Sequence, residues 1–374
     1  MRVLVAMSGG VDSSVAAALL KEQGHDVVGV TMRVWDGEEA IADDVRHGCY
    51  GPDGADIEDA RRVAAALDMP FHVLDLREEY RAVVLDYFRS EYRRGRTPNP
   101  CVRCNPQVKL GAMLAKASHA GIAFDRFATG HYARIEYDTS RGRYLLRKAR
   151  DRAKDQSYFL CYLSQEQLAN AIFPLGDYTK AQVRSIAGRM GLPVKDKPES
   201  QDFVAGDYTS LLGVGLVPGP IMDSARNVLG RHKGIALYTV GQRKGLGLAA
   251  GEPMYVTAID PERNAIIVGH TQDVYQVGLV ASDLNWIAFD TLDGPLEAKA
   301  RIRYRHEEAP ATVSPMSDGK AAVAFSEPQM AITPGQAVVF YDGDVVLGGG
   351  TIETVGLPKN GAMSAIASTQ RGDR

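Results

Sequence analysis

Several features are scarce in this sequence of 374 residues. It has four cysteines, no apolar run that approaches the length of a membrane span, and no room for a signal peptide before its first predicted strand. We therefore expect a cytoplasmic protein that does not associate with membranes. In that compartment, cysteines serve in catalysis or metal binding more often than in disulfides. Excess charge is also missing: the net charge is −3, so a nucleic-acid partner must be held by local basic patches.

Two common nucleotide-binding motifs are absent as well. The chain start has neither the lysine of G-x-x-x-x-G-K-S/T nor the spacing of G-x-G-x-x-G. Residues 8–14 instead read S-G-G-V-D-S-S, between an apolar run at 3–7 and a predicted helix at 11–21. A strand, a glycine turn and a helix aim backbone N–H groups and the helix dipole at one point. The stretch predicts a phosphate site.

The length predicts two or three domains, and the pattern divides the chain. Strands and helices alternate over 1–200, which predicts an α/β domain with a doubly wound parallel sheet. Residues 8–14, Met32 and residues 129–131 follow or end predicted strands, so we expect them to share one pocket. A small central domain is predicted over 201–276 and a C-terminal β-barrel over 277–357. The tail, 358–374, is predicted to be disordered.

A second informative stretch is G-R-T-P-N-P-C-V-R-C-N-P-Q-V-K at 95–109. Its prolines predict a rigid loop that displays Cys101 and Cys104 just before a helix starting near Val108. The helix N-terminus, with Arg103 and Lys109, is expected to favour the thiolate. The pair fits half a zinc site, a redox pair, iron–sulfur ligands, a thiolate nucleophile or sulfur carrier, or two buried thiols. No second C-x-x-C or H-x-x-x-H follows to complete a zinc site.

Five motifs occur in order: S-G-G-V-D-S-S at 8–14, R-T-P-N-P-x-x-x-C-N at 96–105, A-T-G-H-Y at 128–132, K-D-Q-S-Y-F-L at 154–160 and Y-T-V-G-Q-R-K-G-L-G at 238–247. Together they resemble the tRNA-specific 2-thiouridylase family of the PP-loop ATP pyrophosphatase superfamily. The resemblance implies ATP-dependent 2-thiolation of the wobble uridine, an ATP pyrophosphatase domain, a tRNA-binding central domain and a C-terminal barrel. It implies ATP and Mg²⁺, and a monomer that binds the tRNA anticodon stem-loop and takes sulfur from a donor protein or free sulfide.

The resemblance also assigns residues. The implied ATP-binding positions are Ala6, Met7, Ser8, Gly9, Gly10, Val11, Asp12, Ser13, Met32 and Gly130, with Asp12 also in a catalytic role. The implied catalytic nucleophile is Cys104. Contacts with the target base or with tRNA are implied for Asn99, Pro100, Cys101, His131, Lys154, Asp155, Gln156, Arg303, Tyr304 and Gln336. Arg301, Arg303, Arg305 and His306 put cations on one predicted strand face, which from spacing alone is a solvated face and, given the resemblance, is suited to phosphates.

The chain departs from the family in its cysteines. Relatives carry a second catalytic cysteine soon after K-P-E-S-Q-D, whereas here that motif runs directly into Phe203 without one. Three hypotheses follow. Cys101 replaces the missing cysteine; or Cys101 and Cys104 ligate an iron–sulfur cluster of the 4Fe-4S type, with Cys49 or a non-cysteine group as third ligand; or the chain only binds tRNA. Cys161 is expected in the core. Another adenylating enzyme, such as a lysidine, argininosuccinate or GMP synthetase, is the rival that the first motif leaves open.

Overall fold

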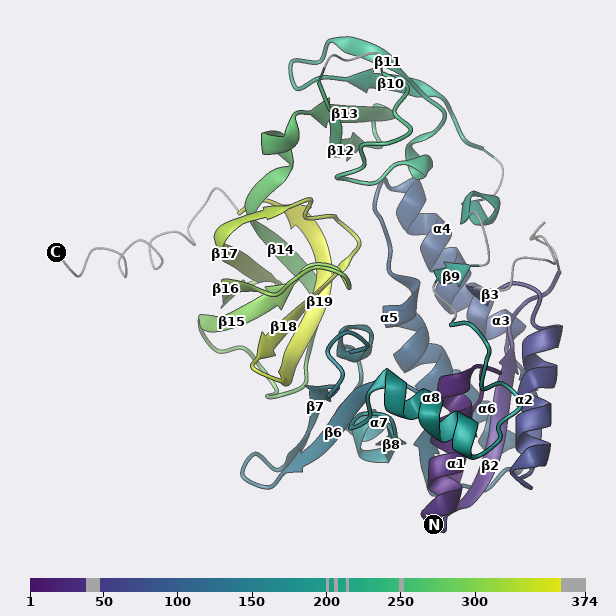
Figure 1. The fold of residues 1–374 in the computed structure, drawn as a ribbon. Coiled ribbons are helices and arrows are strands. Elements are labelled where there is room, and N and C mark those ends of the chain that lie inside the picture. Colours follow the sequence, from purple (N-terminus) through teal and green to yellow (C-terminus); the bar gives the residue numbers. More distant parts are fainter. Residues whose placement is uncertain (38–47, 200–201, 205–207, 213–214, 249–251, 358–374) are drawn as a thin grey trace. The chain divides into compact units, whose positions relative to one another are not determined.

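The computed structural model describes residues 1–37, 48–199, 202–204, 208–212, 215–248 and 252–357. The chain forms two compact units (Figure 1), of which the first holds Met1–Arg89, Pro100–Gly213 and Gly343–Val346 and the second holds the rest. The predicted tail at 358–374 lies outside the described residues. Among the helices described, none has the length and apolar character needed to cross a membrane.

A five-stranded parallel sheet is the centre of the first unit, which confirms the predicted α/β fold. Its order is β4-β2-β1-β5-β8, with every neighbouring pair parallel. The strands are β1 (Arg2–Ala6), β2 (Asp26–Arg33), β4 (Phe71–Asp75), β5 (Arg126–Ala128) and β8 (Ala171–Ile172). Val3, Leu4 and Val5 bury the middle of β1 completely, as expected of a central parallel strand.

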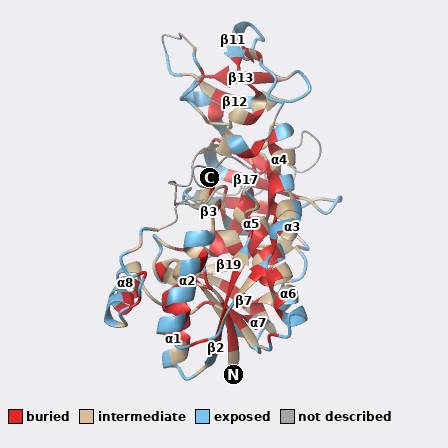
Figure 2. Ribbon diagram, turned by 90° about the vertical axis from the view of Figure 1, so that its right-hand side faces the viewer, coloured by how far each residue is buried: buried red, intermediate tan, exposed pale blue. Residues whose placement is uncertain are grey.

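Helices cover this sheet, and their buried faces form its core (Figure 2). Ala17 and Leu20 of one face of α1 pack with Ala60 and Val63 of α2. Another face of α1 packs against Val183 and neighbouring residues of α8. The helices are α1 (Val11–Glu22), α2 (Gly54–Ala66), α3 (Arg77–Tyr80), α4 (Asp86–Arg93), α5 (Pro100–Cys104), α6 (Met113–His119), α7 (Gln165–Asn170) and α8 (Lys180–Arg189).

The first unit also contains pieces that the sequence pattern did not predict. A short strand, β3 (Gly48–Tyr50), lies between β2 and α2 and pairs in parallel with β9 (Asp202–Val204). An antiparallel hairpin, β6 (Ala133–Asp138) and β7 (Arg143–Lys148), follows the sheet strand β5. Short 3-10 turns lie at Ser157–Leu160 and Tyr208–Leu212.

The predicted rigid cysteine loop is wrong. Cys101 and Cys104 lie on α5, which continues through a π-helical stretch (Asn105–Ala112) into α6. Pro100 is the first residue of α5 and Pro106 the second of the π-helical stretch. Pro100 removes an N–H that would lack a helical partner anyway, whereas Pro106 lies inside the continuous helical run, at its change to π-helical hydrogen bonding. A second π-helical stretch, Arg81–Leu85, joins α3 to α4.

The second unit is built mostly from antiparallel strands, although β10 and β13 pair in parallel. A four-stranded sheet has the order β11-β10-β13-β12, from β10 (Gly219–Met222), β11 (Val228–His232), β12 (Tyr255–Asp260) and β13 (Ala265–Gly269). Short 3-10 turns flank it at Ile235–Leu237 and Thr271–Val274.

The remaining strands close into a barrel. The pairing runs β14-β17-β16-β15-β18-β19 and returns from β19 to β14. The barrel strands are β14 (Tyr275–Trp286), β15 (Leu296–Arg301), β16 (Ala309–Pro315), β17 (Ala321–Met330), β18 (Ala337–Asp342) and β19 (Val345–Val355). The expected basic strand over residues 301–306 is wrong, because β15 ends at Arg301. That side chain pairs with Glu308 at 3.1 Å instead of facing solvent.

Candidate nucleotide and sulfur site

The phosphate-loop motif lies at the carboxyl end of β1, the central strand. Gly9 has φ +70°, and a side chain there would meet the Asp56 carbonyl oxygen at 2.2 Å. The Ser13 hydroxyl accepts from the Ser8 backbone N–H at 3.1 Å and the Ser14 hydroxyl donates to the Gly10 carbonyl at 2.8 Å. No side chain caps α1 at Gly10, so the first-turn N–H groups have no side-chain acceptor. This is the geometry of an anion site.

Gly130 closes one side of the loop. It follows β5, and a Cβ added there would lie 2.7 Å from the Ser13 backbone nitrogen. Only a glycine permits this approach. Met32, in β2, also lies near the carboxyl end of its strand. The predicted ATP-binding residues thus gather at one edge of the sheet.

Charged side chains that the motifs did not reveal surround the loop. Lys180 of α8 lies 2.7 Å from Asp12 and 3.1 Å from Glu199, and the Tyr132 hydroxyl donates to Asp12 at 2.8 Å. Burial, followed by the Asp12 charge, raises the pKa of Tyr132, which keeps the hydroxyl protonated. Lys197 donates to the Gly9 carbonyl at 3.0 Å. These partners are more than 100 residues from the loop in sequence, so no local pattern could identify them.

The two cysteines of α5 are enclosed. Cys104 is 8% exposed and Cys101 is half-buried. Burial raises the pKa of Cys101 to about 12 and that of Cys104 to about 11, and the nearby Lys109 only partly offsets this. The expected thiolate is therefore wrong for this conformation, because desolvation outweighs the cation. Cys161 is fully buried, as expected for a core thiol.

Lys109 interacts electrostatically with the thiols and with His131. Burial lowers its pKa, but the charges of Cys104, Cys49 and Cys101 outweigh burial and raise it. Burial, followed by the Lys109 charge, lowers the pKa of His131, the residue after Gly130, so this imidazole is neutral. The His131 Nδ1 lies 2.6 Å from the Thr129 hydroxyl. The cysteines, Lys109 and His131 thus influence one another's protonation within the first unit.

The cysteine set does not fit an iron–sulfur cluster. Within the ranges that the structure covers, no three His, Cys, Asp or Glu side chains are arranged to hold a metal ion. Cys49, the suggested third ligand, is exposed on β3. Cys101 and Cys104 alone supply two sulfur ligands, so the site as folded lacks the third.

The predicted tRNA-contacting residues in the first unit differ in exposure. Asp155 is 3% exposed and accepts from the Ala149 N–H at 2.9 Å and from the Ser157 hydroxyl at 2.8 Å. The Gln156 side-chain oxygen accepts from the Tyr132 N–H at 2.9 Å. Lys154 is half-buried and contacts Glu199 at 2.7 Å. In this conformation the side chains of Asp155 and Gln156 are used in hydrogen bonds within the first unit.

Other predicted contacts divide between the units. Pro100 begins α5 in the first unit, whereas Asn99 ends a segment of the second. In that second unit the Gln336 amide donates to the Thr97 and Pro98 carbonyls at 2.9 and 3.1 Å. Arg303 donates to the Met330 carbonyl at 3.2 Å, and Tyr304 is half-buried in the turn after β15. Gln336 thus fixes the stretch that leads into the cysteine helix.

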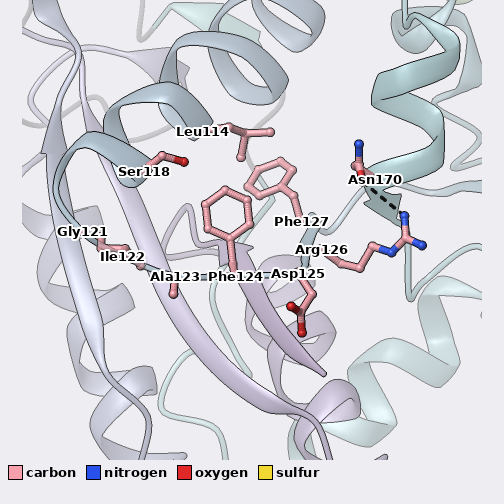
Figure 3. Close-up of a pocket in the computed structure, with 10 residues that line it drawn as sticks. All are labelled: Leu114, Ser118, Gly121, Ile122, Ala123, Phe124, Asp125, Arg126, Phe127 and Asn170. Carbon is pink, nitrogen blue, oxygen red and sulfur yellow. Dashed lines mark hydrogen bonds between the residues drawn. The ribbon is translucent and has the colours of Figure 1, made fainter.

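A separate hollow of mixed polar and apolar lining lies at the amino end of β5 (Figure 3). Phe124, Phe127 and Leu114 gather in it, and Arg126 at its rim contacts Asn170 at 3.3 Å. Ligands of open α/β sheets bind at the carboxyl ends of strands. The hollow is therefore distinct from the candidate site.

Three family models match the chain. The model described as "tRNA methyl transferase HUP domain" matches residues 1–205, the "PRC-barrel domain" model of the same series 212–270, and the "Aminomethyltransferase beta-barrel domain" model 276–352. Curated relatives match over nearly their whole length. A "tRNA-specific 2-thiouridylase MnmA" of Moorella thermoacetica is 54% identical over 94% of this chain and 99% of its own. Proteins of the same name from Desulforamulus reducens and Geotalea uraniireducens are 51% and 52% identical over 96% and 94% of this chain and 99% and 95% of theirs.

Proposed function

Because the chain belongs to the tRNA-specific 2-thiouridylase family, we propose that it replaces the C2 oxygen of the wobble uridine of tRNA with sulfur, using ATP. The observation that carries the proposal is the pairing, within one compact unit, of the S-G-G-V-D-S-S loop with the Cys101–Cys104 pair. The family descriptions mention methyl transfer, but the near full-length relatives are named thiouridylases. The loop and the cysteines both have a role in thiolation.

The loop serves the first half-reaction. The uridine C2 oxygen attacks the α-phosphorus of ATP, the bond to the β-phosphate oxygen breaks, and pyrophosphate leaves with the electron pair. N–H groups at the start of α1 stabilise that anion, together with the Mg²⁺ that accompanies ATP, for which Asp12 offers a carboxylate. Ala6–Ser13, Met32 and Gly130 line the place for the nucleotide. As a carbonyl, the C2 oxygen is a poor leaving group; once adenylated, it can leave as part of AMP in the second half-reaction.

The cysteines serve the second half-reaction. A donor protein that carries a persulfide loads Cys104: the Cys104 sulfur attacks the donor's terminal sulfur, the donor's S–S bond breaks and the donor leaves as a thiol. The terminal sulfur of the Cys104 persulfide then attacks C2 and expels AMP. The Cys101 thiolate then attacks the Cys104 sulfur, the S–S bond to the nucleoside breaks, and 2-thiouridine leaves. The resulting Cys101–Cys104 disulfide is reduced by an external thiol. Residues at i and i+3 face the same side of a helix, although their Cβ atoms, roughly 5–6 Å apart, must approach for a disulfide.

The test is thiolation of an unmodified tRNA anticodon stem-loop with Mg²⁺-ATP and a persulfide donor, followed by mass spectrometry of the nucleosides. We expect 2-thiouridine with the wild type and none with Cys104→Ser or Cys101→Ser. Cys161→Ala, which removes a thiol of the core, is the matched control and should retain activity if its melting temperature is unchanged. Full activity of Cys101→Ser would exclude the two-cysteine relay, and the absence of 2-thiouridine with the wild-type protein would exclude the function.

A further inference from the structure

The loop lacks a cation of its own, and Lys180 brings one to it. The Lys180 ammonium lies 2.7 and 2.9 Å from the two Asp12 carboxylate oxygens and 3.1 Å from a Glu199 oxygen. Its side chain is 12% exposed. An ammonium in such surroundings makes strong charge-assisted hydrogen bonds.

The position of Lys180 is fixed by its helix. It is the first residue of α8, which Thr179 and Gln182 cap with a reciprocal pair of hydrogen bonds. The Lys180 backbone N–H donates to Asp151 at 2.9 Å. Since α8 packs directly against α1, the Lys180 ammonium is held beside the N-terminus of α1, which follows the glycines of the phosphate loop.

The second lysine at the loop is bound differently. Lys197 contacts the Gly9 carbonyl at 3.0 Å and Asp56 and Asp59 at 2.5 Å each, so all three N–H donors are used to join the loop to α2. By contrast, the Lys180 ammonium makes two of its hydrogen bonds to the Asp12 carboxylate. Its other partner, Glu199, also contacts Lys154 at 2.7 Å and Arg184 at 3.9 Å. If the Lys180 ammonium moves toward a bound phosphate, Glu199 therefore still has Lys154 and Arg184 as partners, and Asp12 still accepts from Tyr132.

We propose that Lys180 is a phosphate-binding and positioning residue of the nucleotide site. In the nucleotide-free protein, the Lys180 ammonium is paired with Asp12. When ATP binds, the ammonium moves to contact the β- and γ-phosphate oxygens, which later leave as pyrophosphate. As the bond at the α-phosphorus breaks, the electron pair moves onto the leaving oxygen, and Lys180 stabilises this charge without transferring a proton. The inference rests on the proposed function, since it requires ATP to bind at this loop.

The test compares Lys180→Met, which keeps an apolar stem without the charge, with Lys180→Arg, which keeps the charge. The control is Lys116→Met, which likewise removes a paired ammonium, because Lys116 of α6 contacts Glu79 of α3 at 2.8 Å. Calorimetry measures binding of inorganic pyrophosphate and of an ATP analogue that cannot be cleaved at the α-phosphate, both with Mg²⁺. We expect Lys180→Met to bind both about tenfold or more weakly, Lys180→Arg to retain most affinity, and Lys116→Met to be unchanged.

If Lys180 only neutralises Asp12, Lys180→Met lowers the melting temperature but binds pyrophosphate like the wild type, and the proposal is wrong. If Lys180→Met does not fold, a measurement on the wild-type protein tests the proposal instead. Lysine labelling followed by mass spectrometry should show that pyrophosphate alters the labelling of Lys180 and leaves Lys116 unaffected; no change at Lys180 overturns the proposal. Neither experiment contains tRNA or sulfur, so failed thiolation would not affect this result, and failed pyrophosphate binding would not by itself exclude thiolation.

Discussion

At the scale of single residues, the protonation of the cysteines governs sulfur chemistry. The pKa of Cys104, raised to about 11 by burial, lies above the ordinary thiol value, so less thiolate is present at any pH below it. At pH 8 the thiolate fraction is roughly a hundredfold below that of a thiol with a pKa of 9. We expect iodoacetamide to modify the exposed Cys49 first, and Cys104 modification to keep accelerating up to about pH 11.

Peptide mapping after alkylation at several pH values measures the modification rates of Cys49 and Cys104. Lys109→Met should slow Cys104 further, because removing the ammonium raises the thiol pKa more. Equal rates for Cys49 and Cys104 at pH 8 would show that the thiol is ionised, contrary to the structure.

Asp155 is a second residue whose role the structure sharpens. Its oxygens accept bonds from Ala149 and Ser157 inside the protein. Asp155→Ala should lower the free energy of unfolding by about 2 kcal/mol, because it leaves buried donors unpaired. Asp155→Asn should cost less, since its amide oxygen still accepts from the Ala149 N–H. Denaturant unfolding measures both, and a fully stable Asp155→Ala protein would contradict the structural role.

At the scale of elements, the close approach of β5 to α1 depends on Gly130. Gly130→Ala places a methyl group 2.7 Å from the Ser13 nitrogen, so the loop must shift and ATP binding should weaken by tenfold or more. Gly188→Ala in α8 is the control, because a side chain there meets nothing within 4 Å and alanine favours a helix. Nucleotide titration measures the binding. Unchanged affinity in Gly130→Ala would contradict the packing.

The elements also show what the sequence could predict. Buried apolar strands and the glycine loop follow local rules, and β1, α1 and the parallel sheet were predicted correctly. The cysteine helix was missed because Pro100 and Pro106 suggest a loop, yet both stand near the starts of helical segments. The thiol pKa was predicted with the wrong sign, because burial by distant residues is invisible in the sequence.

At the scale of the whole molecule, binding of tRNA should depend strongly on salt. With a net charge of −3, the protein must contact phosphates through local cations. Lys154→Met should reduce the slope of log affinity against log salt concentration by about 0.7–0.9, the value for one lost phosphate contact. Filter binding or anisotropy from low to moderate salt measures the slope. An unchanged slope would show that Lys154 remains with Glu199 when tRNA binds.

The chain-wide organisation was largely predictable, whereas the site's charges were not. The α/β domain, the barrel and its turns follow from alternation and turn residues that lie close in sequence. Lys180, Lys197 and Glu199 reach the loop only after folding, from 168 or more residues away.

The central claim is that the uridine C2 oxygen is adenylated at the loop before sulfur replaces it. Its most direct test uses an anticodon stem-loop whose target uridine carries an oxygen isotope label at C2, incubated with the wild-type protein, Mg²⁺-ATP and a persulfide donor. Mass spectrometry of the released AMP then locates the label. The proposal predicts labelled AMP in equal amount to 2-thiouridine and pyrophosphate. Thiouridine formed with unlabelled AMP would contradict it.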